Sequence, residues 1–231
     1  MSTADFQFWW WVARRIVTEK IGDVYLWTAL DQDTKLVASF VVGKRSADIA
    51  RKLMVDLRNC MVMPNAHQSD AHAHKTGSYL QISTDGFPAY PEAVDLAFGP
   101  YAKYGQLIKD YRNTDQPGRY GPPEMVGTER RGIFGINEEE KRTICTSYVE
   151  RHNLTIRTLM KRFTRLSLGF SKKLQNLEAA CAMFLCFYNF VWRTRDAING
   201  RTRLPAAMAA GVSESLMDFE ALFDKVMGNA A

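Results

Sequence analysis

The acidic residue most suggestive of chemistry is Asp85, which follows a short apolar segment and precedes Gly86 and Pro88. Residues 79–83 favour a buried strand, so this carboxylate is predicted to stand at the carboxyl end of a strand. Functional groups in open α/β sheets gather at that edge. Alternatively, Asp85 caps the helix that begins near Pro88. Position alone leaves both interpretations open.

A second candidate is Glu150, which lies in the segment 148–157 (YVERHNLTIR). On the helix predicted here, steps of three and four place Glu150, Asn153, Arg157 and Lys161 on one face. The simpler interpretation is a solvated face on which Glu150 forms ion pairs with neighbouring basic residues. The more specific one is a carboxylate that meets Asp85 in the fold.

Several segments of the chain resemble motifs of a known protein family. Residues 83–90 (STDGFPAY) and 148–157 are similar to the second and third acidic motifs of the insertion sequence 1 family of bacterial DDE transposases. Further similar segments are 22–31 and 42–45 (strands), 162–167 and 170–174 (a basic helical stretch), and 188–190 and 204–211 (the tail). The resemblance extends from residue 22 to residue 211, with the motifs in the family's order.

This resemblance implies phosphoryl transfer on DNA, in which water cleaves a strand and a 3′-hydroxyl then attacks target DNA. Two Mg²⁺ or Mn²⁺ ions, held by carboxylates, would stabilise the attacking and leaving oxygens. Asp85 and Glu150 are the implied catalytic and metal-binding residues, and Arg157 the implied phosphate contact. The other implied DNA-binding residues are Arg151, Lys161, Arg162, Arg165, Lys172 and Lys173. The implied partners are transposon ends, target DNA and further copies of the chain.

The first of the family's three carboxylates is the least well matched. The candidate for this catalytic and metal-binding residue is Asp5, which would then face Asp85 across the parallel strand pair. However, Phe6 stands where the family has a second acidic residue. Asp31 is the fallback, because it also ends a predicted strand. That strand would be antiparallel and at the opposite edge, so Asp31 is better explained as a turn residue. The family's zinc-binding and helix-turn-helix region has no counterpart among these residues.

The elements that would position these carboxylates form an α/β layout. Strands are predicted at 6–12, 24–30, 36–42, 79–83 and 104–108, and helices at 46–60, 88–98, 146–166, 172–195 and 214–227. We expect a ribonuclease-H-like, mixed five-stranded sheet, with the first three strands antiparallel and the fourth parallel to the first. Residues 1–211 would form one catalytic domain with an irregular insertion at 113–140, and 212–231 a C-terminal helix or tail.

Charge and composition agree with a partner that is a polyanion. The net charge is +5, yet residues 141–203 alone contain 13 Lys and Arg against 3 Asp and Glu. Such a basic segment is typical of nucleic-acid binding.

The longest apolar stretch, residues 179–192, is shorter than the about 20 residues that a bilayer span requires. No secretory signal is visible, so we expect a reducing cytoplasm. None of the four cysteines forms a Cys-x-x-Cys pair, so a zinc ribbon is not expected within these residues. The family resemblance adds the expectation of a bacterial, nucleoid-associated protein.

Three functions remain open on the sequence alone. The first is a metal-dependent DNA transposase that works as an oligomer. The second is a truncated or inactivated transposase-derived protein that binds DNA without cleaving it. The third is a ribonuclease that acts on RNA–DNA hybrids. The identity of the first carboxylate separates the first two.

Overall fold

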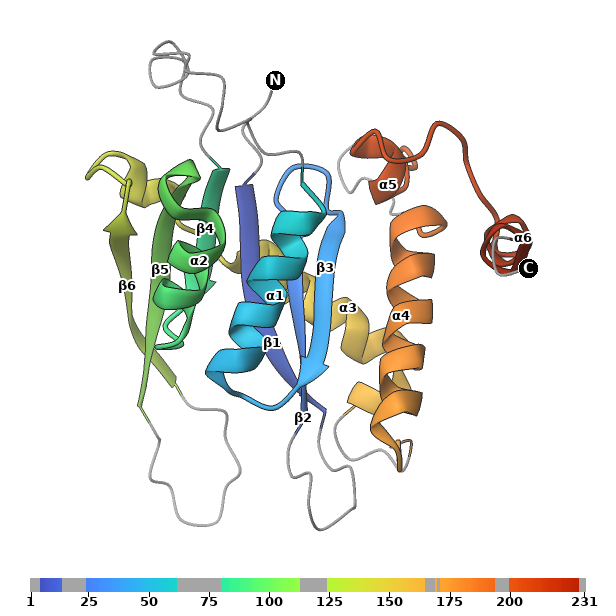
Figure 1. Cartoon of the computed structure of the whole chain (residues 1–231), viewed down its shortest axis with the longest axis horizontal. Helices are drawn as coiled ribbons and strands as arrows, with labels where there is room; N and C mark the ends of the chain where they lie inside the picture. The colour runs from blue at the N-terminus through green and yellow to red at the C-terminus, as the bar shows by residue number, and fades with distance from the viewer. Residues whose placement is uncertain are drawn as a thin grey trace.

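The structure is a computed structural model that describes residues 5–13, 24–61, 80–112, 124–164, 169, 171–193 and 200–228. Arg165 and residues 113–123 of the expected insertion lie outside these ranges, as does the side chain of Asp5. Within them, the chain forms a mixed sheet covered by helices on both faces (Figure 1).

The sheet has the strand order β3-β2-β1-β4-β5-β6. Its strands are β1 (Asp5–Ala13), β2 (Val24–Asp31), β3 (Val37–Gly43), β4 (Leu80–Asp85), β5 (Ala102–Arg112) and β6 (Glu124–Phe134). The first three strands pair antiparallel, and β4 lies parallel to β1, as the sequence predicts. β5 continues parallel to β4, so the carboxyl end of β4 is flanked on both sides by parallel neighbours.

β6 corrects the expectation of five strands. It pairs antiparallel with β5 in the region for which the sequence predicted an irregular insertion. Its sequence, EMVGTERRGIF, lacks the apolar–polar alternation of a half-buried strand, since Glu129, Arg130 and Arg131 are three charged residues in a row. All three are exposed at the sheet edge. Pairing with β5 therefore determines this strand, and local propensity contributes little.

One face of the sheet is covered by α1 (Ala47–Asn59) and α2 (Tyr90–Phe98) (Figure 1). α1 buries Leu53 and Leu57 at helical spacing. These leucines join a core that contains Trp27 of β2 and Ile82 of β4. α1 lies in the connection between β3 and β4, which brings β4 parallel to β1, and α2 lies in the connection between β4 and β5.

The other face is covered by α3 (Ser147–Leu159) and α4 (Leu174–Phe190). Ile156 of α3 and Leu177 of α4 pack on Val24, Leu26 and Val42. α3 ends at Leu159, seven residues before the end that the sequence predicts, and a 3₁₀ turn follows (η3, Lys161–Phe163). The hydroxyl of Thr164 donates to the carbonyl of Arg157 at 3.0 Å, which satisfies one of the helix's last carbonyls.

The C-terminal part contains α5 (Ala206–Ala209) and α6 (Phe219–Gly228). α5 contacts α4, whereas α6 lies apart from the sheet and from the helices that cover it (Figure 1). The helix predicted at 172–195 is confirmed as α4 but ends at Phe190, and the last helix begins at Phe219 instead of Glu214. No helix among the described residues is long and apolar enough to cross a membrane.

Candidate active site and nucleic-acid interface

Asp85 is the last residue of β4 and its side chain is buried. Its carboxylate accepts a hydrogen bond from the backbone N–H of Phe87 at 3.3 Å, which closes the turn after the strand. α2 begins five residues after Asp85, at Tyr90, and its first turn has no side-chain cap. Asp85 is therefore not the helix cap that the sequence allowed, and the strand-end position is confirmed.

Glu150 lies in the first turn of α3 and is held by two donors. The ammonium of Lys109 contacts its Oε1 at 2.5 Å, and the hydroxyl of Thr146 donates to the same oxygen at 2.6 Å. The Lys109 side chain is 15% exposed and that of Glu150 is 33% exposed, so this ion pair is largely shielded from water. The ion pairing that the sequence offered as the simpler interpretation is present, with a partner on β5 that the sequence did not identify.

Lys109 connects the neighbourhoods of Glu150 and Asp85. Asp85 pairs in register with Leu107 of β5, and Lys109 lies two residues further along that strand. Side chains alternate along a strand, so Asp85, Leu107 and Lys109 point to the same face of the sheet. α3 covers this face, so Asp85 and Glu150 lie on the same side of the sheet, toward the carboxyl ends of β4 and β5.

Asp5 does not face Asp85. The parallel register pairs Asp5 with Gln81 and Gln7 with Ser83, so Asp85 stands four residues further along β4. Four residues of strand span about 13 Å, which is too far for one metal ion to bridge. Continued by two residues, the register places Trp9 beside Asp85. The prediction that Asp5 faces Asp85 is therefore wrong.

Asp31 is a turn residue, as the sequence favoured. Its carboxylate accepts hydrogen bonds from the backbone N–H of Thr34 at 3.0 Å and from the Thr34 hydroxyl. Its backbone pairs with Phe6 at the amino end of β1, on the far side of that strand from β4. Asp31 therefore does not replace the missing third carboxylate.

These observations bear on whether the chain fits a two-metal centre. Among the described residues, no group of three or more His, Cys, Asp and Glu side chains could hold a metal ion. Asp85 and Glu150 offer the hard oxygen ligands that Mg²⁺ prefers. However, the ammonium of Lys109 already neutralises Glu150. The described residues therefore do not fit a two-ion centre, and we derive no reaction step through one.

The basic residues gather where α3 ends and α4 begins. Lys161, Arg162, Lys172 and Lys173 are all exposed. The guanidinium of Arg162 donates to the Ser171 hydroxyl, which ties η3 to the residues just before α4. Met160 and Phe163 are buried and fix this turn against the sheet. Two basic pairs separated in sequence are thus brought together on the surface.

The helix face that the sequence predicts from Glu150, Asn153, Arg157 and Lys161 is only partly confirmed. Arg151 is exposed, Asn153 is buried and Arg157 is half-buried. Lys161 lies beyond the end of the helix, so it does not extend the stripe that Glu150, Asn153 and Arg157 form. Arg157 is consequently less accessible to a DNA phosphate than the sequence suggested, and the exposed lysines nearby are better placed.

Sequence reasoning missed His152, which is the most unusual titratable group of α3. The residue is 3% exposed, and its ring packs on Tyr188 with a centroid distance of 4.4 Å. Neither ring nitrogen has a hydrogen-bond partner among the described residues. Burial lowers the pKa of His152 to about 3. The spacing of His152 from Val149 and Ile156 was the signal for its burial, because steps of three and four mark one helix face.

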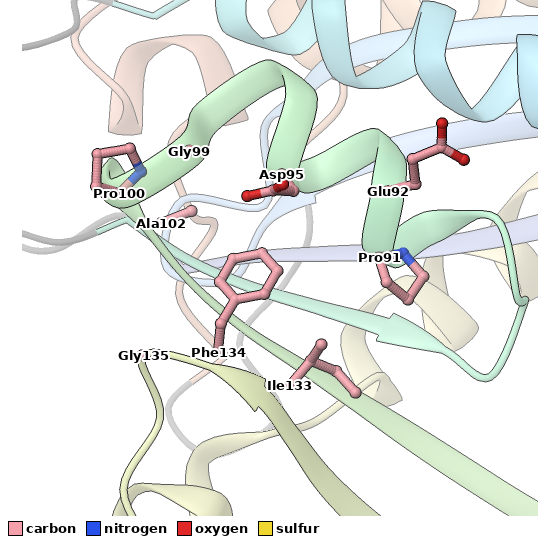
Figure 2. A pocket seen from close by; sticks show the side chains of 9 residues that line it. All are labelled: Pro91, Glu92, Asp95, Gly99, Pro100, Ala102, Ile133, Phe134 and Gly135. Atoms are coloured by element: carbon pink, nitrogen blue, oxygen red, sulfur yellow. The ribbon is translucent and has the colours of Figure 1, made fainter.

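An open hollow of about 560 Å³ lies between α2 and the end of β6 (Figure 2). Phe134, Ile133 and Pro91 give it a mostly apolar lining, and Glu92 and Asp95 line it from α2. It contains none of the site residues predicted from the sequence. The hollow lies near the beginning of β5, whereas Asp85 pairs with Leu107 further along that strand.

Comparison with known proteins adds no family assignment. Neither a scan against protein-family models nor a search of curated proteins found a match. The functional assignment therefore depends on the geometry above and on the resemblance of the acidic motifs.

Proposed function

We propose that this chain is a transposase-derived DNA-binding protein with a ribonuclease-H-like fold, associated with the bacterial nucleoid. The strand order β3-β2-β1-β4-β5, with β2 antiparallel and β4 parallel to β1, supports this fold, and β6 is an addition at one edge. The proposal depends mainly on two exposed basic pairs, Lys161–Arg162 and Lys172–Lys173. The hydrogen bond from Arg162 to Ser171 brings the two pairs close together.

This surface suits the DNA backbone better than a base-specific partner. Lysine and arginine side chains that neutralise phosphates release counterions, and this release gives affinity without sequence readout. The pairs stand at the junction of two elements anchored by Met160 and Phe163, so their spacing is preorganised. DNA binding without sequence preference is the expected result.

Metal-dependent strand cleavage and transfer is the second candidate. It is favoured by the position of Asp85 and Glu150 on the same side of the sheet. Two observations weigh against it. The ammonium of Lys109 holds Glu150, and the register of β1 keeps Asp5 four residues away from Asp85. We therefore rank binding above cleavage for this chain.

Binding is tested by fluorescence anisotropy of a labelled DNA duplex at low salt. We expect Lys172→Ala to weaken affinity by roughly fivefold, the effect of losing about one phosphate contact. The matched control is Lys52→Ala, which removes an exposed lysine from α1 on the opposite face of the sheet. The proposal fails if the duplex does not bind, or if both substitutions weaken binding equally.

Cleavage is tested on supercoiled plasmid with Mg²⁺ or Mn²⁺. We expect no nicking above that of the Asp85→Asn variant. Nicking that disappears in both Asp85→Asn and Glu150→Gln would instead establish the transposase as an active enzyme. Release of RNA fragments from an RNA–DNA hybrid, abolished by the same substitutions, would favour the ribonuclease.

A further inference from the structure

The outer face of α4 is apolar although it faces away from the core. The inner face packs on the sheet through Leu177, Cys181 and Leu185. On the opposite side, a continuous strip is formed by Ala179, Ala182, Met183, Cys186 and Phe190. Met183 is 63% exposed, and Glu178 is the only charged residue in the helix. A helix that is apolar all round is normally covered on both sides.

α6 also has apolar side chains in water, although its Leu222 is buried. Phe219, Phe223 and Met227 recur at steps of four residues, and each is at least half exposed. Figure 1 shows α6 beyond α4 and away from the sheet. An exposed row of large apolar side chains on a helix is a strong signal for a partner surface.

Length and charge match the two helices to each other. α6 has 10 residues and spans about 15 Å, so it fits along the 17-residue α4. The segment 212–228 contains four acidic residues and one lysine, Lys225. Three exposed arginines, Arg193, Arg201 and Arg203, follow α4 in the sequence. The carbonyl of Arg203 accepts a hydrogen bond from Arg193 at 3.3 Å, which holds two of these arginines at one place.

We infer that the outer face of α4 is the docking surface for α6 of a second copy of this chain. Each copy has both an α4 surface and an α6 helix. In a two-fold symmetric dimer, α6 of each copy therefore packs on α4 of the other. The small side chains of Ala179 and Ala182 permit close approach of the docked helix. The acidic residues of α6 then lie near the arginines at the end of α4. Lys172 and Lys173, at the other end, remain open.

The mass in solution tests the dimer. Light scattering with size-exclusion chromatography should give twice 26.3 kDa for the full chain. Phe223→Glu and Met183→Glu should each return it to the monomer mass. The matched control is Leu96→Glu on α2, which is 65% exposed but lies outside both helices and should remain dimeric. A thermal melt confirms that each variant is folded. A monomeric parent chain, or a monomeric control, overturns the inference.

A disulfide experiment separates docking between copies from other arrangements. Two chains are prepared in a background with Cys60, Cys145 and Cys186 replaced by Ala, one with Met183→Cys and the other with Phe223→Cys, so that each carries one introduced cysteine beside the buried Cys181. When they are mixed and oxidised, a disulfide between the two different chains is expected. Disulfides only between identical chains would show a different interface. With both cysteines in one chain, a disulfide that closes within the monomer would show that α6 covers its own α4. Either result overturns the proposal, as does the absence of any disulfide.

Discussion

His152 shows how one residue can couple folding to pH. Its imidazole is buried against Tyr188, and neither ring nitrogen has a hydrogen-bond partner among the described residues. The protonated form is therefore excluded from the folded state, and the pKa of His152 is lowered from 6.5 to about 3. The unfolded chain binds a proton here below pH 6.5, whereas the folded chain does not.

We predict that the free energy of unfolding falls as the pH decreases from 6.5 toward 3. The contribution of His152 is about 1.4 kcal/mol per pH unit, since the unfolded state alone gains the proton. Urea unfolding at pH 7 and pH 5 should show a loss about 2 kcal/mol larger in the natural chain than in His152→Leu. Other groups that titrate in this range affect both chains alike. An equal loss in both would show that His152 is protonated in the folded state.

Among the elements, the β5–β6 pair and the start of α3 depend on close contacts that no local pattern reveals. Gly105 of β5 lies against Ile144, a buried residue just before α3. A Cβ at Gly105 would meet the Cγ1 of Ile144 at 2.8 Å and the Cδ1 of Ile136 at 3.0 Å. Glycine is thus required here so that the segment leading to Glu150 can approach the sheet.

We predict that Gly105→Ala lowers the free energy of unfolding by about 1–3 kcal/mol, because Ile144 must move. Gly127→Ala in β6 is the matched control, since the nearest atom to its added Cβ would be the Oδ2 of Asp110 at 3.7 Å. Chemical denaturation of both variants measures the difference. If the two substitutions lower the free energy of unfolding equally, the close approach of Ile144 is not the reason for a glycine at position 105.

At the scale of the whole molecule, charge is distributed unevenly. Residues 141–203 contain 13 of the 30 Lys and Arg but 3 of the 25 Asp and Glu, and they include α3, α4 and the turn between them. These elements cover one face of the sheet, whereas α1 and α2 cover the other. The basic surface is therefore a property of one layer.

We predict that DNA affinity falls steeply with salt. Each phosphate neutralised contributes about −0.9 to the slope of log K against log salt. The double substitution Lys172→Ala and Lys173→Ala should flatten the slope by roughly two units if each lysine contacts one phosphate. Lys52→Ala should leave it unchanged. Anisotropy titrations between 50 and 200 mM salt, about the range over which counterion release is measured, provide the slopes. If the double substitution leaves the slope unchanged, DNA binds at a surface other than Lys172 and Lys173.

The amino-acid sequence alone determined the antiparallel β1–β2–β3 arrangement, the parallel β4 and the strand-end position of Asp85, because apolar periodicity and turn residues are local signals. Only the tertiary structure decided the rest. β6 exists because β5 pairs with it, Lys109 meets Glu150 across 41 positions of sequence, and the register moves Asp5 four residues away from Asp85. Register, edge pairing and long-range ion pairs depend on the relative positions of whole elements. Those positions are set by packing between residues far apart in the chain, which one segment does not encode.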